Sequence, residues 1–338
     1  MDMIAKTTIQ HMIDALEKGQ TPNVDPEEIP CFSKAALAEN PVVTERHLEE
    51  ILNRLTKADI PTLKRALVSL EHDDQAWLGF KVVTDPAACT SDDPGDEDTP
   101  ISSDWGPSED GQSCIFFANE GKDIVCSRPW NKRDRFQMLD ITRGPSMHKD
   151  QFAGVTWVST PLFATQRVVI YGAGDVSVAL ARYAHDCGFD TLVVDDDASF
   201  LSKERFATSE RVLLSEDWSD LPEKVELTAN DYCVCVSRGH IHDVATVAFS
   251  VKSPAAYVGM MGHPAKNKDV FDKLVAHGVD EEALKGVHAP IGIKIADKTP
   301  AEIAISIIAE LIDVRGKARK QAAANVAALV SDQAASNR

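Results

Sequence analysis

The stretch Val168-Val-Ile-Tyr-Gly-Ala-Gly-Asp-Val-Ser177 decides the fold, because it joins a short apolar run to the start of an amphipathic pattern. The apolar run predicts a buried strand, and the pattern after it predicts a helix over 176–187. Gly172 permits a tight turn between them. Gly174 lets the backbone approach a phosphate at the helix N-terminus, where free N–H groups and the helix dipole favour an anion. Ser177, at the third glycine position, is small enough for close packing. The turn therefore predicts a bound nucleotide-like ligand, contacted by Gly172, Ala173, Gly174, Asp175 and Val176.

Strand and helix patterns alternate along the rest of the C-terminal half. Further strands are predicted over 191–194, 211–214, 232–236 and 256–259. This alternation is typical of a parallel sheet with helices on both faces. We therefore predict an α/β fold with a Rossmann-like domain over 161–320. Its last helix is expected over 300–314, followed by a polar, Ala-rich tail that frays, with 321–338 as the tail segment.

Asp195 ends the second predicted strand about 20 residues after the glycine turn, where a carboxylate binds ribose hydroxyls in dinucleotide folds. With Gly172 and Gly174 it makes NAD a possible ligand. Asp175 argues the other way, since a carboxylate beside the helix N-terminus opposes an anion. A Rossmann fold that has kept its turn and lost its ligand stays open as an alternative.

The segment Ser237-Arg-Gly-His-Ile-His-Asp243 follows another predicted strand, at the sheet edge where open α/β folds bind ligands. Arg238 offers a planar fork for a phosphate or another oxyanion, and His240 and His242 can donate hydrogen bonds to the same group. The alternative is structural: Asp243 caps the following helix and His242 packs in the protein. The sequence leaves both interpretations open.

Gly259, Gly262 and His263 end the next predicted strand, and Lys266 follows them. They are expected at the same edge of the sheet, so we include the two glycines and His263 among the candidate cofactor-binding residues. Thr299 is expected to cap the last helix, with Pro300 in its first turn.

The first 160 residues predict a separate, mixed α+β domain. Ile9, Met12, Ile13 and Leu16 recur at helix spacing, and short β-like runs follow at 113–117 and 123–126. The segment 84–112 is rich in Asp, Pro, Ser and Gly, so it cannot bury enough apolar surface to fold by itself. We predict a flexible excursion there, and no chemical motif is evident in this half.

Composition limits the class of protein. The chain has 338 residues, 43% of them hydrophobic, and a formal net charge of -18, which repels nucleic acid and anionic lipid. No apolar run reaches the roughly 20 residues of a membrane span, and the N-terminus lacks a signal-peptide core, so a cytoplasmic protein is expected. The seven cysteines include no CxxC pair, which favours reduced thiols. Cys233 and Cys235 are expected on one face of a buried strand, as core residues.

Six blocks of the C-terminal half together resemble the XdhC/CoxI family of molybdenum-hydroxylase maturation factors. They are Tyr-Gly-Ala-Gly-Asp-Val at 171–176, Val-Asp-Asp-Asp at 194–197, Glu-Arg-Phe at 204–206, Ser-Arg-Gly-His-Ile-His-Asp at 237–243, Tyr-Val-Gly-Met-Met-Gly at 257–262, and His-Ala-Pro-Ile-Gly-Ile with Thr-Pro-Ala-Glu-Ile-Ala-Ile-Ser at 288–306. The chain departs from the family at Asp175, where a His is usual, and at Asp197 and His263-Pro264, where basic residues are usual.

The resemblance implies a non-catalytic accessory protein. Such a protein binds the molybdenum cofactor (molybdopterin), protects its sulfurated form and delivers it to an apo molybdenum hydroxylase such as xanthine dehydrogenase. A cysteine desulfurase and a second copy of the chain are the other implied partners. Two further functions stay open from the residues: an NAD-dependent oxidoreductase with His240 or His242 as acid/base, and, on weaker grounds, a metal hydrolase built on these histidines and Asp243.

Overall fold

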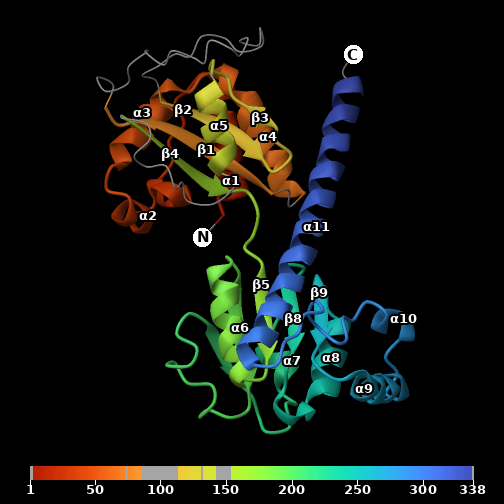
Figure 1. Ribbon diagram of the computed structural model, residues 1–338. Coiled ribbons are helices and arrows are strands. Elements are labelled where there is room, and N and C mark those ends of the chain that lie inside the picture. The colour runs from red at the N-terminus through yellow and green to blue at the C-terminus, as the bar shows by residue number, and fades with distance from the viewer. Residues whose placement is uncertain (1–2, 73–74, 86–112, 131, 142–153, 337–338) are drawn as a thin grey trace. The chain divides into compact units, whose positions relative to one another are not determined.

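The computed structural model describes residues 3–72, 75–85, 113–130, 132–141 and 154–336. The chain divides into two compact units, one formed by Met1–Ala164 with Ala318–Arg338 and the other by Thr165–Lys317 (Figure 1). Most of the predicted acidic excursion, residues 86–112, lies outside the described residues.

The first unit is an α+β domain, as predicted, and is built on an antiparallel sheet of order β3-β2-β1-β4. The strands are β1 (Ala76–Val83), β2 (Cys114–Asn119), β3 (Ile124–Val125) and β4 (Val155–Pro161). The helices are α1 (Lys6–Glu17), α2 (Lys34–Glu39), α3 (Glu45–Arg54), α4 (Ile60–Glu71) and α5 (Lys132–Asp140), with 3-10 turns η1 (Pro26–Glu28), η2 (Pro30–Phe32) and η3 (Lys57–Asp59). The predicted apolar stripe of α1 is buried.

Side chains alternate across this sheet, so its two faces bury different sets of residues. Leu78, Phe80 and Val82 of β1 pack with α1, α3 and α4 in the main core. Phe116 and Ala118 of β2 point to the other face and pack with Met138 of α5. The unit therefore has a helical layer on each side of the sheet.

The second unit is a parallel sheet of order β7-β6-β5-β8-β9 in a Rossmann-like arrangement. Its strands are β5 (Arg167–Tyr171), β6 (Asp190–Asp195), β7 (Glu210–Leu213), β8 (Asp231–Cys235) and β9 (Tyr257–Met260). Its helices are α6 (Asp175–Asp186), α7 (Leu221–Lys224), α8 (Asp243–Val251), α9 (Pro264–Ala276), α10 (Glu281–Leu284) and the first part of α11 (Pro300–Ser336), with the 3-10 turn η5 (Arg238–His240). The residues of α11 from Ala318 onward are assigned to the first unit. The strand order reverses between β5 and β8, which is where such folds form a crevice for ligands.

Helices cover both faces of this sheet, as the alternating pattern predicted. Val168 and Ile170 of β5 pack with α6 and α11 on one face, whereas Val169 and Tyr171 pack with α8 and α9 on the other (Figure 1). Cys233 and Cys235 are fully buried in that second core, which confirms their interpretation as core residues.

The last helix is longer than predicted. Thr299 caps it, since its hydroxyl accepts a hydrogen bond from the Glu302 N–H, but the helix continues beyond Val314 to Ser336. The segment expected as a fraying tail is therefore helical over residues 321–336. Its alanines explain this, because Ala has the highest helix propensity.

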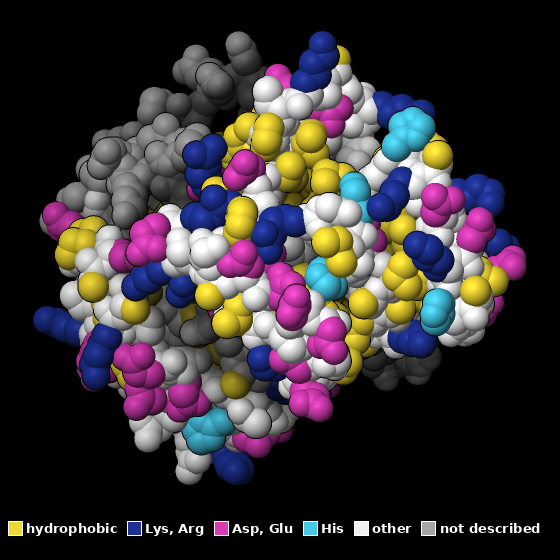
Figure 2. Space-filling view, turned by 90° about the horizontal axis from the view of Figure 1, so that it is seen from below, with side chains coloured by type: hydrophobic (Ala, Val, Ile, Leu, Met, Phe, Trp, Pro, Cys, Tyr) yellow, Lys and Arg dark blue, Asp and Glu magenta, His cyan; other side chains and the backbone are white. Residues whose placement is uncertain are grey.

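The negative charge is not gathered into one region of the face seen in Figure 2, where acidic and basic side chains are interspersed. Among the described residues, no helix combines the length and the apolar character that crossing a membrane requires.

Candidate functional site

Gly172 makes the turn that connects β5 to α6, as predicted. Its φ of +110° is in the range that favours glycine, and its N–H donates to the Val194 carbonyl. A Cβ at this position would lie 2.7 Å from the Val236 carbonyl oxygen and 2.8 Å from the Ser237 Cα. The loops after β5 and β8 therefore touch, backbone to backbone, at the strand-order reversal.

Gly174 is the N-cap of α6, and no side chain caps this helix. A Cβ at Gly174 would contact only the Arg238 Cγ, at 3.7 Å, so the backbone at Gly174 is not closely covered on that side. Asp175 is the first residue of α6; its side chain is 77% exposed and lies 3.3 Å from the Arg205 guanidinium. The first turn thus combines uncapped N–H groups with one exposed carboxylate.

Asp195, at the end of β6, connects three loops. One carboxylate oxygen accepts the Ala173 N–H at 2.6 Å. The other accepts the Asp197 N–H and an Arg238 Nη2–H, both at 2.9 Å. The residue is 1% exposed, so the carboxylate predicted to bind a ribose is instead bound by protein donors.

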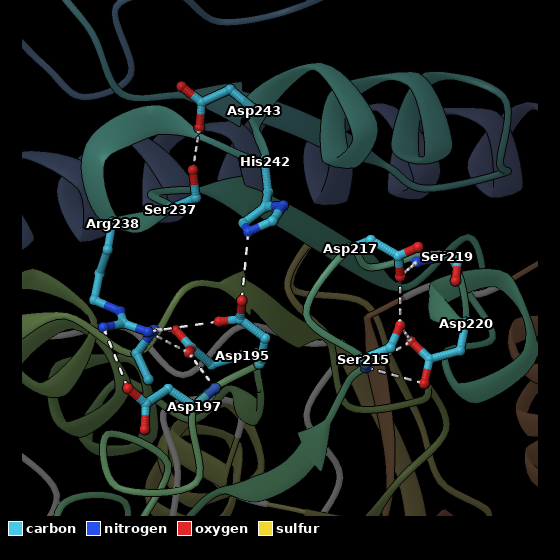
Figure 3. Close-up of polar contacts among 12 residues, drawn as sticks. Asp195, Asp197, Ser215, Asp217, Ser219, Asp220, Ser237, Arg238, His242 and Asp243 are labelled. Atoms are coloured by element: carbon cyan, nitrogen blue, oxygen red, sulfur yellow. Dashed lines mark hydrogen bonds and ion pairs between the residues drawn. The ribbon is translucent and has the colours of Figure 1, made fainter.

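Arg238 faces a row of carboxylates (Figure 3). Its guanidinium lies 2.9 Å from Asp195, 3.5 Å from Asp196 and 3.6 Å from Asp197, and it stacks on the Phe200 ring at 3.9 Å. Hydrogen bonds from Ser199, with a smaller contribution from Arg238, lower the pKa of Asp197. The fork predicted to hold an oxyanion is therefore already paired with acids.

His240 has an unusual backbone conformation. Its φ is +62°, which is uncommon for histidine, and the preceding Gly239 has a φ of +64°. Its Nδ1 lies 2.8 Å from one Asp243 oxygen, and the Ser237 hydroxyl donates to the other at 2.6 Å. Figure 3 shows the Ser237–Asp243 contact.

The helix cap at Asp243, one of the two alternatives that the sequence left open, is not formed. His242 occupies the N-cap position of α8, and Asp243 is the first helical residue, fully buried, with its carboxylate directed back to Ser237 and His240. A buried carboxylate needs hydrogen-bond partners. The contacts of Asp243 with Ser237 and His240 meet this need, and they fix the loop to the start of α8.

His242 packs against an aromatic residue that sequence reasoning missed. Its ring stacks on Trp218 with centroids 4.5 Å apart and an interplanar angle of 13°. Its Nε2 lies 3.6 Å from an Asp196 oxygen (Figure 3). These contacts agree with the packing role that the sequence left open for His242.

Gly259, Gly262 and His263 serve the local structure around β9 and α9. Gly259 lies inside β9 rather than after it, and a Cβ there would come within 2.5 Å of the Ile291 side chain. A Cβ at Gly262 would lie 2.2 Å from Asn267 Oδ1, and His263 caps α9 by accepting the Ala265 N–H. Their contacts are with β9, α9 and Ile291.

Three residues of the site carried no individual assignment from sequence. Phe200 lies beneath Arg238 and 5.4 Å from the Arg205 guanidinium, and Trp218 supports His242. Arg205 belongs to the Glu-Arg-Phe block of the family resemblance, which was the available signal; it also donates to the Ala173 carbonyl. Within the described ranges, no group of three or more His, Cys, Asp or Glu residues is arranged to hold a metal ion.

The match to a known family concerns this second unit. Residues 168–311 match the family model described as the XdhC Rossmann domain. The chain is 31% identical over 152 residues to the uncharacterized protein YqeB of Escherichia coli K12, covering 45% of this chain and 28% of that protein. It is 26% identical over 149 residues to a probable xanthine dehydrogenase subunit of Bacillus subtilis 168, covering 44% of this chain and 43% of that protein.

A crystal structure described as a xanthine dehydrogenase from Bacillus halodurans matches with 17% identity and a TM-score of 0.44, over 78% of this chain and 69% of that chain. The chain spans less than half the length of the two curated relatives it matches. The family match covers the Gly172 turn, the row of aspartates and the Ser237–Asp243 loop. The unit that carries these features therefore belongs to the XdhC family of Rossmann domains, which confirms the resemblance drawn from its six sequence blocks.

Proposed function

We propose that this chain is an accessory protein in the maturation of a molybdenum hydroxylase of the xanthine dehydrogenase type, and that the turn from Gly172 to Gly174 holds the phosphate of the molybdenum cofactor. Membership of the XdhC domain family and the relation to the Bacillus subtilis protein support the partner class. The observation that carries the site is the uncapped N-terminus of α6 beneath the open position at Gly174. Uncapped helix N-termini are ready-made sites for phosphate.

We expect the cofactor phosphate to be bound mainly by backbone N–H groups and less by charged side chains. Arg238 is paired with three carboxylates, and Arg205 lies beside Asp175. Neither cation adds net positive charge at the turn, so the N–H groups of the first turn of α6 supply the binding. When bound, the cofactor supplies the redox chemistry of the hydroxylase, and the chain's own residues bind and orient it.

The oxidoreductase alternative gains no support from Asp195. A bound NAD needs a carboxylate on its ribose hydroxyls, and both oxygens of this one accept protein N–H groups. The cysteine desulfurase partner, the homodimer and the cytoplasmic location stay predictions.

Substitution of Gly174 tests the phosphate site. We expect Gly174→Val to weaken cofactor binding at least about tenfold, or about 1.4 kcal/mol, because the side chain fills the approach path of the phosphate. The fold should stay intact, since φ is -72° and the nearest atom to a Cβ is 3.7 Å away. Gly174→Ala should have a smaller effect. Activation of the apo-hydroxylase by cofactor-loaded protein and the melting temperature are the two measurements; full activation by Gly174→Val contradicts the proposal.

Removing the negative charge of Asp175 should strengthen ligand binding, in contrast to the substitution of Gly174. Asp175→Asn removes an exposed carboxylate that opposes an anion at the helix N-terminus, so we expect phosphate-bearing ligands to bind about two- to fivefold more tightly. Asp186→Asn, at the other end of α6, is the matched control and should leave binding unchanged. Equilibrium titration with the cofactor at low ionic strength measures both. Equal affinities of the wild type and Asp175→Asn would place the phosphate elsewhere.

A further inference from the structure

The face of the first sheet that packs against α5 carries polar and sulfur groups in an otherwise apolar layer. Lys81 of β1 pairs in register with Cys114 of β2, so both side chains lie on this face. The Lys81 ammonium makes an ion pair of 3.0 Å with Asp134 of α5, and each side chain is only 8% exposed. This layer therefore holds a buried ion pair beside a thiol.

A second thiol joins the first on the same face. The register of β2 with β3 pairs Phe117 with Val125, which places Cys126 across from Phe116 and on the side to which Cys114 points. Cys126 donates a hydrogen bond from Sγ to the Ile115 carbonyl at 3.3 Å, and it packs against the same apolar layer as Phe116. Cys114 is 7% exposed, whereas Cys126 is only partly buried. Cys126 is thus the more exposed residue of the pair.

The two sulfurs differ in reactivity. The hydrogen bond from Cys114 lowers the pKa of Cys126, and Arg128 contributes in the same direction. The hydrogen bond with Cys126 and burial raise the pKa of Cys114. By contrast, burial raises the pKa of Cys233 to about 11 and also raises that of Cys31. Since the thiolate is the nucleophile, Cys126 is the reactive thiol of the pair.

We propose that Cys114 and Cys126 form a redox-active dithiol, in which a peroxide oxidises Cys126 and Cys114 closes a disulfide. The Cys126 sulfur attacks one peroxide oxygen, the O–O bond breaks, and the leaving oxygen takes the thiol proton, which gives a sulfenic acid and water from hydrogen peroxide. The Cys114 sulfur then forms the S–S bond and displaces a second water. In total, two thiols lose two electrons and two protons. A dithiol reductant reverses the step by thiol exchange.

The test uses the full chain and hydrogen peroxide. The reduced protein is exposed to about one equivalent of peroxide, alkylated and mapped by mass spectrometry; cleavage after Glu109 and after Lys122 places Cys89, Cys114 and Cys126 on separate peptides. We expect a linked Cys114–Cys126 peptide, the loss of two thiols per chain, and recovery of both with dithiothreitol. In Cys114→Ser, Cys126 should stop at a sulfenic acid that dimedone traps. Cys187→Ser, which removes a partly buried thiol of the second unit, is the matched control and should behave as the wild type.

Three results overturn the proposal. They are a disulfide from Cys126 to any other cysteine, overoxidation of Cys126 while Cys114 keeps its thiol, and oxidation of Cys187 as fast as that of Cys126. Peptide mapping of the wild type alone distinguishes these outcomes, so the conclusion does not depend on the folding of a variant. It is also independent of the cofactor site, which lies in the other unit.

Discussion

Gly172→Ala is expected to lower the free energy of unfolding by about 3 kcal/mol. Two effects add at this position. The φ of +110° is strained for any residue with a Cβ, and the new methyl group would lie 2.7 Å from the Val236 carbonyl oxygen and 2.8 Å from the Ser237 Cα. Both obstacles are backbone atoms, so no rotation of a side chain relieves the overlap. The loop after β8 has to move away from the turn after β5.

Gly188→Ala separates the two effects. Gly188 has a φ of +76°, but nothing lies within 4 Å of its Cβ position, so only the cost of the backbone conformation applies, about 1 kcal/mol. Chemical denaturation with a common m-value measures both variants. Equal destabilisation of the two would mean that the contact between the loops contributes nothing to stability.

Four strands of the second unit, β5, β6, β8 and β9, were predictable as short apolar runs between polar segments, whereas the edge strand β7 is largely exposed. The prediction at 191–194 lies inside β6, and that at 211–214 differs from β7 by one residue at each end. The helix predicted over 176–187 is shifted by one residue from α6. Buried parallel strands are apolar on both faces, which makes their existence clear from composition even where their ends are not.

The end of the last helix was harder to predict, because Gly316 follows Val314 and glycine commonly ends a helix, yet α11 continues through it. No proline follows, and alanine is frequent from residue 322 onward. The stretch was taken as a tail because it is polar, but polarity alone does not end a helix whose residues have high propensity. A single glycine costs a helix only about 1 kcal/mol, so the alanine-rich residues that follow can continue it.

The location of the candidate site could be predicted from the sequence, but the contacts between its residues could not. Gly172, Asp195 and Arg238 lie at or just after the ends of β5, β6 and β8. Because these strands are parallel, the three residues lie at the same edge of the sheet. Which groups pair there depends on loop geometry that residue spacing does not encode. Arg238 was assigned to an oxyanion, whereas Asp195 to Asp197 surround it, and Trp218 reaches His242 from the segment that follows β7.

His240→Asn gives the sharpest test of function in the Ser237–Asp243 loop. Asparagine tolerates a positive φ, and its side-chain amide can replace the Nδ1 hydrogen bond to Asp243, which lies 2.8 Å from the ring. The free energy of unfolding should therefore change by less than about 1 kcal/mol. The substitution removes Nε2, the ring nitrogen that is not directed to Asp243. If His240 orients the bound cofactor, activation of the apo-hydroxylase should fall about tenfold or more, the effect of losing one hydrogen bond to a charged group.

His240→Ala is the comparison variant, because it loses both ring nitrogens and leaves the buried Asp243 carboxylate one partner short. It should be less stable than the wild type by about 1–3 kcal/mol. Activation is measured with equal amounts of folded protein, so that stability and function are separated. If His240→Asn activates its partner as the wild type does while His240→Ala is destabilised, the imidazole only holds the loop. If both lose activation and only His240→Ala loses stability, the exposed side of the ring contacts the cofactor or the hydroxylase.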